Sequence, residues 1–163
     1  MIDKIKPSRS EKIIFIFILT LATFTITSFF LLKNKCLFVK DFDPKDFVFD
    51  RPENIVILNI DCGNVIIELY PDLSPNSVER FKTLIKSKAY DDVAFHRVVK
   101  DKLVQAGDVE FGKRNNIDYG KIGTGKSGLG TLNSEVDKDF NYDAGSVALA
   151  RSQKYNTEDS QFF

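Results

Sequence analysis

Phe95-His96-Arg97-Val98-Val99 and, after five further residues, Gln105-Ala106-Gly107-Asp108 are the two blocks that predict the fold most directly. The β-branched residues beside the arginine indicate a short strand, and a polar turn at residues 100–102 joins it to a second strand that carries the glutamine. An arginine and a glutamine should therefore lie on adjacent strands. A planar cation and an amide that face a groove suit a site that binds a peptide bond without breaking it.

A hairpin and one helix precede this pair of strands. Apolar runs at 55–60 and 65–70 predict two strands joined by a turn at 61–64, where Gly63 can take a positive φ. Ser74 is then expected to cap a helix that has Pro75 at its first position. The apolar face of that helix recurs at helical spacing and comprises Val78, Phe81, Leu84, Ile85 and Ala89.

The fold class follows from the number of short strands. Further strands are expected at 93–99, 103–107, 146–150 and 160–163, with a long Gly- and Asn-rich stretch between residues 112 and 130. Many short strands with one early helix predict a mainly-β fold, a closed or nearly closed antiparallel β-barrel.

Two functions are disfavoured by charge and by context. Residues 53–163 carry 14 basic and 17 acidic side chains, a net charge of −3, so no basic stripe is available for nucleic acid. Residues 120–127 match the phosphate-binding pattern G-x-x-x-x-G-K-[ST] letter for letter. That pattern needs a buried strand before it and a helix after it. Neither flank fits, so nucleotide binding is not expected.

The N-terminus has the composition of a membrane anchor. A basic segment at 1–12 precedes an uncharged run at 13–32, and 20 helical residues span roughly 30 Å, the thickness of a hydrocarbon core. The threonine hydroxyls in the run can bond back to helix carbonyls. We expect a single-pass membrane protein with its domain on the extracytoplasmic (periplasmic) side. A cleaved secretory signal is the alternative, and basic residues on both sides of the span leave the orientation weakly determined.

Residues 33–52 read as a tether to a domain at 53–163. Phenylalanines alternate there with charged residues, Pro44 and Pro52 interrupt any regular period, and the aromatic rings suit either the bilayer surface or the domain. The chain has two cysteines, Cys36 beside the membrane and Cys62 at the hairpin turn. Two cysteines are too few for a disulfide framework, and the sequence does not favour a bond between them.

His96 is the single histidine of the chain. No serine, cysteine or carboxylate pattern around it forms a catalytic triad, and no second histidine or cysteine pair accompanies it. We therefore expect no metal and no cofactor. The imidazole could act as a general base, but it is better suited to hydrogen-bond a neighbouring loop and so fix the arginine strand.

The order of these blocks resembles that of the cyclophilins. Five blocks between residues 55 and 163 occur in the same order as in cyclophilin-type peptidyl-prolyl cis-trans isomerases of the bacterial kind. They are Phe-His-Arg-Val-Val, Gln-Ala-Gly-Asp, Gly-Thr-Gly, Ser-Val-Ala-Leu-Ala-Arg-Ser and Ser-Gln-Phe-Phe. The resemblance implies rotation of X–Pro bonds in polypeptide substrates during protein folding. By resemblance Arg97 is the catalytic residue, with His96 in support. The implied substrate-binding residues are Leu103, Gln105, Ala150, Gln161 and Phe163.

Three departures from the family pattern bear on this implied site. Lys102 stands where a pocket phenylalanine is common, and Arg151 where many members have asparagine. A family domain also continues beyond Ser-Gln-Phe-Phe, so we expect an incomplete barrel without its C-terminal strands. Cyclosporin-like ligands would bind such a pocket weakly. The alternative to an enzyme is a catalytically impaired peptide-binding module or a non-functional fragment of a cyclophilin.

Overall fold

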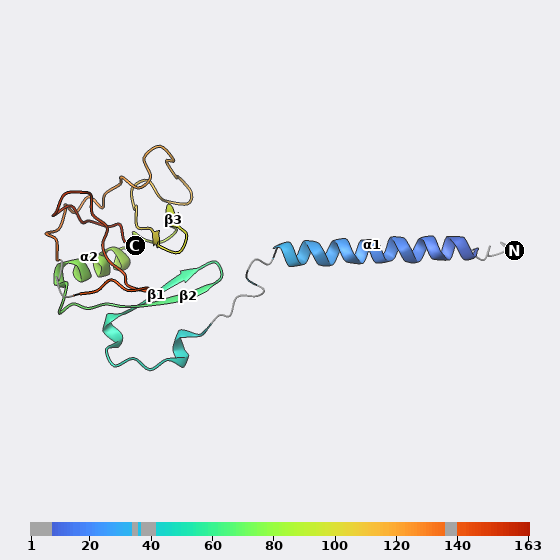
Figure 1. Ribbon diagram of the computed structural model, residues 1–163, viewed down its shortest axis with the longest axis horizontal. Helices are drawn as coiled ribbons and strands as arrows, with labels where there is room; N and C mark the ends of the chain where they lie inside the picture. Colours follow the sequence, from blue (N-terminus) through green and yellow to red (C-terminus); the bar gives the residue numbers. More distant parts are fainter. Residues whose placement is uncertain (1–7, 34–35, 37–41, 136–139) are drawn as a thin grey trace. The chain divides into compact units, whose positions relative to one another are not determined.

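The computed structural model describes residues 8–33, 36, 42–135 and 140–163. Most of the expected basic segment and part of the expected tether lie outside these residues. The chain divides into two compact units, Met1–Val48 with Ile57–Ile66, and Phe49–Val56 with Ile67–Phe163. Its elements are labelled in Figure 1 where space permits and run in the order α1 (Arg9–Lys33), η1 (Pro44–Asp46), η2 (Pro52–Asn54), β1 (Ile55–Ile60), β2 (Gly63–Glu68), α2 (Pro75–Lys86), β3 (Arg97–Val99) and β4 (Leu103–Gln105).

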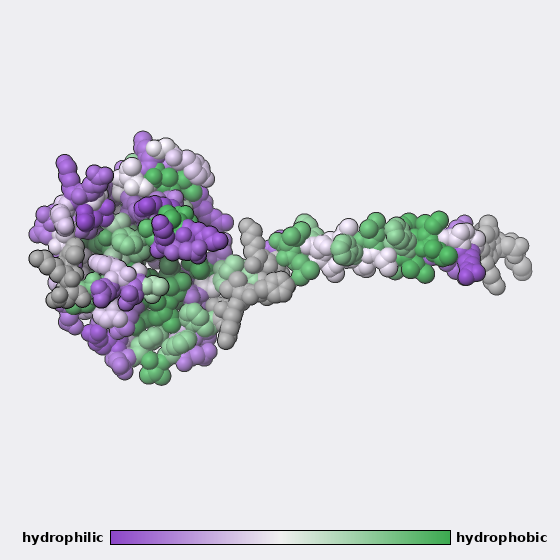
Figure 2. Space-filling model, in the orientation of Figure 1, coloured by the Kyte–Doolittle hydropathy of each residue, from purple (hydrophilic) through white to green (hydrophobic). Residues whose placement is uncertain are grey.

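Helix α1 contains the whole of the expected apolar run. It is long and apolar enough to cross a membrane by length and composition, with a hydropathy of 2.3, and Figure 2 shows apolar side chains along its visible face. Ser8 and Glu11 form a capping box, because the Ser8 N–H donates to the Glu11 carboxylate (2.6 Å) and the Glu11 N–H donates to the Ser8 hydroxyl (3.2 Å).

The four threonine hydroxyls inside α1 are hydrogen-bonded within the helix, as the sequence suggested. Thr20, Thr23 and Thr25 donate to carbonyls three residues earlier at 2.8–2.9 Å, and Thr27 donates to Thr23 at 2.9 Å. Their polar groups therefore add little to the cost of placing this helix in a hydrocarbon layer.

The hairpin is present, with a tighter turn than expected. β1 and β2 form a two-stranded sheet, and β2 begins at Gly63 rather than at residue 65. Gly63 has a φ of +142°, so its predicted positive φ is confirmed. Only Asp61 and Cys62 remain in the turn.

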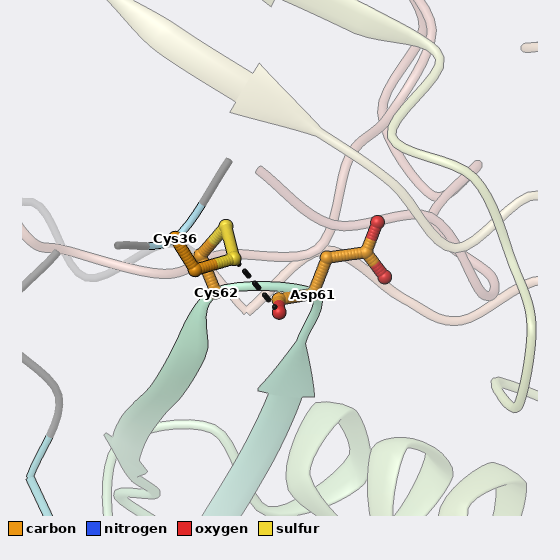
Figure 3. Close-up of a disulfide and its surroundings, with 3 residues drawn as sticks. All are labelled: Cys36, Asp61 and Cys62. Carbon is orange, nitrogen blue, oxygen red and sulfur yellow. Dashed lines mark hydrogen bonds between the residues drawn. A yellow bond between two sulfur atoms is a disulfide. The ribbon is translucent and has the colours of Figure 1, made fainter. Parts of the chain in front are cut away.

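The two cysteines form a disulfide, and the sequence-based expectation was wrong. Cys36 and Cys62 are joined with their Cα atoms 4.9 Å apart, across a sequence separation of 26 residues (Figure 3). The tether returns to the hairpin here, since the side-chain amide of Asn64 donates to the Phe42 carbonyl at 3.5 Å. No local sequence pattern predicts this bond, because the spacing of two cysteines in the sequence does not show whether their Cα atoms come close enough in the fold.

The second unit has its core on one face of α2. Val78, Phe81 and Leu84 of that helix are buried together with Ile67, Leu69, Ala106 and Phe162. The rings of Phe81, Tyr90 and Phe162 pack with centroids 5.1–5.5 Å apart. The predicted apolar face is thus confirmed over most of its length, although Ala89 lies beyond the last helical residue, Lys86.

Helix α2 begins at Pro75 as predicted, but Ser74 does not cap it. Ser74 makes no side-chain bond to the helix. The carboxylate of Glu135 accepts the N–H groups of Asn76 (3.0 Å) and Ser77 (2.8 Å) instead. Burial opposes ionisation of Glu135, but these bonds outweigh it and hold the pKa of that carboxyl below its usual value. A charged acceptor at the positive end of a helix binds more strongly than a hydroxyl.

Fewer residues form regular strands than the sequence predicted. β3 and β4 are three residues each, and the predicted strands at 146–150 and 160–163 appear as isolated bridges, Ala106 with Phe162 and Leu149 with Phe162. Over the described part of the chain the regular strands form two separate two-stranded sheets. A closed barrel is therefore not observed there.

Candidate functional site

The centre of the candidate site is the antiparallel pair β3–β4. Arg97 lies directly opposite Gln105, and Val99 opposite Leu103. The Arg97 guanidinium donates to the amide oxygen of Gln105 at 3.2 Å. Residues 100–102, which join the strands, set this register, and a one-residue slip would turn the arginine and the glutamine to opposite faces.

A second glutamine continues this polar chain away from the arginine. The side-chain N–H of Gln105 donates to the amide oxygen of Gln161 at 3.0 Å. The side-chain N–H groups of Gln161 then donate to the carbonyls of Gly123 (3.0 Å) and Gly125 (3.1 Å). Because each amide is held at both ends, the arginine has a fixed partner rather than a mobile one.

Among the remaining expected pocket residues, Leu103 lies on β4 itself, and Ala150 and Phe163 lie on neighbouring backbone segments. The Ala150 N–H donates to the Gln161 carbonyl at 2.7 Å, and Phe163 exchanges two backbone hydrogen bonds with Ala148 at 3.0 and 3.1 Å. Leu103 and Ala150 are half-buried, and the Phe163 residue keeps 39% of its surface exposed. The bridges through Phe162 connect these segments to β4 by way of Ala106.

The imidazole of His96 does not make the hydrogen bond that we expected. Both ring nitrogens are buried, and neither has a hydrogen-bond partner among the described residues. The ring packs against a glycine loop instead, since a Cβ built on Gly123 would lie 3.5 Å from Cδ2 of His96. The backbone N–H of His96 donates to the Gln105 carbonyl at 3.1 Å. In the described structure, His96 contacts the loop by packing.

Sequence reasoning missed Asp108, which organises the loop behind the two glutamines. Its side chain is fully buried, and one carboxylate oxygen accepts the N–H groups of Glu110 (3.2 Å) and Phe111 (2.8 Å). The other accepts those of Gly123 (2.6 Å) and Gly125 (3.0 Å). Burial opposes ionisation, but the four bonds outweigh it and lower the pKa of Asp108. The only signal in the sequence was its place in the Gln-Ala-Gly-Asp block.

The same contacts explain why the glycine motif at 120–127 does not form a phosphate loop. Its N–H groups at Gly123 and Gly125 already bind the Asp108 carboxylate, and a Cβ at Gly125 would overlap that carboxylate. The Ser127 N–H donates to the Asp159 carboxylate at 2.9 Å. Turns and irregular backbone surround the segment in place of a strand and a helix. The internal carboxylates occupy the donors that a phosphate would need.

A buried ion pair, also missed from the sequence, fixes the segment that carries Gln161. The Arg80 guanidinium of α2 donates to the Asp159 carboxylate at 2.6 Å, with side chains only 10% and 4% exposed. The Ser127 hydroxyl also hydrogen-bonds Asp159. One residue on, the Tyr90 hydroxyl donates to the Ser160 carbonyl at 2.7 Å. Burial first, and the nearby Asp159 charge second, raise the pKa of Tyr90, so its hydroxyl stays protonated as a donor.

These contacts suit a protein that binds extended polypeptide. A guanidinium held on one strand, amide side chains beside it and a half-exposed aromatic ring offer partners for peptide carbonyls and for an apolar side chain. The chain belongs to the cyclophilin family. The family model described as cyclophilin type peptidyl-prolyl cis-trans isomerase/CLD matches residues 55–163.

Individual relatives agree with this assignment. A probable peptidyl-prolyl cis-trans isomerase of Brucella suis is 44% identical over 113 residues, which cover 69% of this chain and 57% of that protein. A peptidyl-prolyl cis-trans isomerase of Schizosaccharomyces pombe is 34% identical over 66% of this chain and 64% of its own length. The chain therefore spans between about half and two thirds of these curated relatives.

Solved structures give the same fold. A cyclophilin type peptidyl-prolyl cis-trans isomerase from Cryptosporidium parvum superposes with a TM-score of 0.51 and 28% identity, over 61% of this chain and 59% of that one. A cyclophilin from Hirschia baltica gives a TM-score of 0.52 at 20% identity, over 68% and 56% of the two chains. At that identity the second match speaks for the fold alone.

Proposed function

We propose that this chain is a peptidyl-prolyl cis-trans isomerase in which Arg97 stabilises the twisted X–Pro amide. Rotation about that bond must break amide resonance, against a barrier of about 18–20 kcal/mol. In the transition state the prolyl nitrogen becomes pyramidal and regains a lone pair. A guanidinium N–H aimed at that lone pair stabilises the twisted state more than the planar one, which lowers the barrier without covalent chemistry.

The observation that carries this proposal is the bond between Arg97 and Gln105. Among the residues that the structure describes, it engages one N–H of a guanidinium that has five, at a residue that is exposed on β3. The bond restrains a long side chain that would otherwise lose rotamer freedom on binding substrate. The arginine is thus oriented before the substrate arrives, while donors remain to face it.

The neighbouring residues are assigned to substrate binding. Gln105 and Gln161 would hydrogen-bond the substrate backbone, and Ala150 would allow that backbone to approach because its side chain is small. Leu103 and Phe163 would form the apolar surface for the proline ring. Lys102 is exposed, so its ammonium can extend into water rather than fill this surface.

The proposed location of the protein is the membrane, which it would cross once, with its domain outside the cytoplasm. Helix α1 has the length and composition of an anchor, and a signal sequence has the same properties. The disulfide Cys36–Cys62 supports the extracytoplasmic side, since disulfides persist in oxidising compartments and are rare in the cytosol. Its cysteine at position 36 follows α1, so cleavage after the helix would leave the bond intact.

A protease-coupled isomerisation assay on the full chain in detergent micelles tests the catalytic proposal. We expect Arg97→Ala to lower kcat/KM by two orders of magnitude or more, about 3 kcal/mol of lost transition-state stabilisation. Arg114→Ala is the matched control, because Arg114 is an exposed arginine of the same domain whose backbone N–H bonds Asp92 (2.8 Å). Equal activity of the two variants would refute the role of Arg97.

The alternative, a peptide-binding module without activity, has its own signature. Such a chain would bind a proline-containing peptide in fluorescence anisotropy, lose that binding on Gln105→Ala, and give no acceleration of isomerisation by folded protein.

A further inference from the structure

The disulfide joins the C-terminal end of α1 to the turn of the β1–β2 hairpin. Cys36 follows the last residue of α1, Lys33, by three positions, and Cys62 lies in the two-residue turn of the β1–β2 hairpin. Their Cα atoms are 4.9 Å apart. The bond therefore connects the end of the apolar helix to the tip of a hairpin that begins more than 20 residues later in the sequence.

The surroundings of the bond also suit its formation. The sulfur of Cys36 lies 3.2 Å from the carbonyl oxygen of Asp61 (Figure 3). A disulfide sulfur carries no hydrogen, so this is a close contact in the oxidised chain. In the dithiol chain the same approach lets the Cys36 thiol donate to that carbonyl, which holds the two sulfurs near each other before oxidation.

Covalent geometry shows how far the bond shortens the connection. Three extended residues span about 10 Å, so with the 4.9 Å step the hairpin turn lies within about 15 Å of the helix end. Without the bond, the covalent connection from α1 to Phe49, where the second unit begins, runs through the 16 peptide units after Lys33. Covalent geometry limits that connection to at most about 55 Å.

We propose that Cys36 and Cys62 are an oxidative modification site that straps the β1–β2 hairpin to the membrane surface. This rests on the proposed membrane anchor. The partner is a thiol–disulfide oxidoreductase of the extracytoplasmic compartment. The two thiols release two protons and two electrons as the S–S bond forms, and the electrons reduce the disulfide of the partner to a dithiol.

The strap narrows the substrate class of the isomerase. A compact domain of about 110 residues is about 35 Å across. Its site would reach polypeptides within about 50 Å of the bilayer when strapped, and within about 90 Å when only the extended tether holds it. The substrates are therefore proline-containing chains at the membrane surface, such as segments that have just crossed it.

Thiol trapping in native membranes tests whether the site is used. The chain has two cysteines, so a maleimide–polyethylene glycol reagent gives a direct count. We expect no mass shift in denatured, untreated membranes and a shift by two reagent units after reduction. A shift by two units without prior reduction would overturn the proposal.

Fluorescence quenching in lipid vesicles tests the strap itself. The chain has no tryptophan, so a single introduced tryptophan is a unique reporter. Asn59→Trp places it on β1 near the turn, and the quencher is a lipid with a spin label at its headgroup. We expect at least twofold stronger quenching in the oxidised chain than in the same chain carrying Cys36→Ser. Equal quenching in the two chains would overturn the strap.

A second reporter separates the strap from the proposals on which it rests. Phe24→Trp lies within α1, and lipids brominated in their tails should quench it equally with and without Cys36→Ser. If the tryptophan of Phe24→Trp is not quenched, both the membrane anchor and the strap are refuted. Isomerase activity on a soluble peptide is measured on the same samples, and its absence would refute the enzyme while the quenching result stands.

Discussion

Replacing Asp108 by asparagine should strongly destabilise the domain. Each carboxylate oxygen of Asp108 accepts two backbone N–H groups. Asparagine has one oxygen, so in either orientation its NH2 group faces two N–H donors that have lost their acceptor. Each buried, unpaired donor costs about 1–3 kcal/mol. The loss is then about 2–6 kcal/mol, against a typical total stability of about 5–15 kcal/mol.

Urea and thermal unfolding of the full chain in micelles measure this loss. Tyrosine fluorescence reports the domain, because the chain has five tyrosines and no tryptophan. At about 4 °C for each kcal/mol, the melting temperature should fall by about 8–24 °C. Asp118→Asn is the control, since the 43% exposed Asp118 side chain accepts one N–H from Gly120 (3.0 Å) and otherwise pairs only with the exposed Lys121 (3.5 Å) among the described residues. Equal melting temperatures for the two variants would refute the reasoning.

Three further outcomes follow from the same contacts. Because the pKa of Asp108 is lowered in the folded chain, its contribution is complete above about pH 5 and is lost as the pH falls below 4. The urea midpoint should therefore drop more between pH 7 and pH 3 in the native chain than in Asp108→Asn, and parallel drops would contradict this. Asp159→Ala leaves the nearly buried Arg80 cation without its carboxylate partner, although the carbonyls of Leu129 and Gly130 still accept from it, and should cost about 3–5 kcal/mol in urea unfolding; a cost below 1 kcal/mol would show that the pair contributes little. Tyr90→Phe removes the bond to the Ser160 carbonyl and should cost about 1–3 kcal/mol, which the same titration would show as a lower midpoint; an unchanged midpoint would argue against that bond.

The candidate site shows where local sequence is sufficient. The pairing of Arg97 with Gln105 depends on two short runs that contain valine and on the three-residue turn between them, all within nine residues. Gln161 was placed in the site by resemblance to the family, and the structure brings it within 3.0 Å of Gln105. Its second contact, to the glycine loop, had no signal in the sequence, because the partners are backbone carbonyls that any residue supplies.

The capping of α2 shows where local sequence misleads. Ser74 followed by Pro75 is a common helix start, and the helix does begin there, but the cap is the carboxylate of Glu135, some 60 residues away. Local patterns report which groups need partners. They do not report which distant group becomes the partner, because that depends on how the intervening chain packs.

Local sequence patterns were enough to predict the apolar N-terminal helix, the hairpin, the buried face of α2 and the arginine–glutamine strand pair. Each of these depends on residues a few positions apart, where periodicity and turn chemistry act directly. Three features could be learned from the folded chain alone: the Cys36–Cys62 bond, the burial of Asp108 and the Arg80–Asp159 pair. These join segments 15 to 79 residues apart. Such partners are chosen by the burial of apolar faces, and the polar groups that are buried with them must then bond to one another.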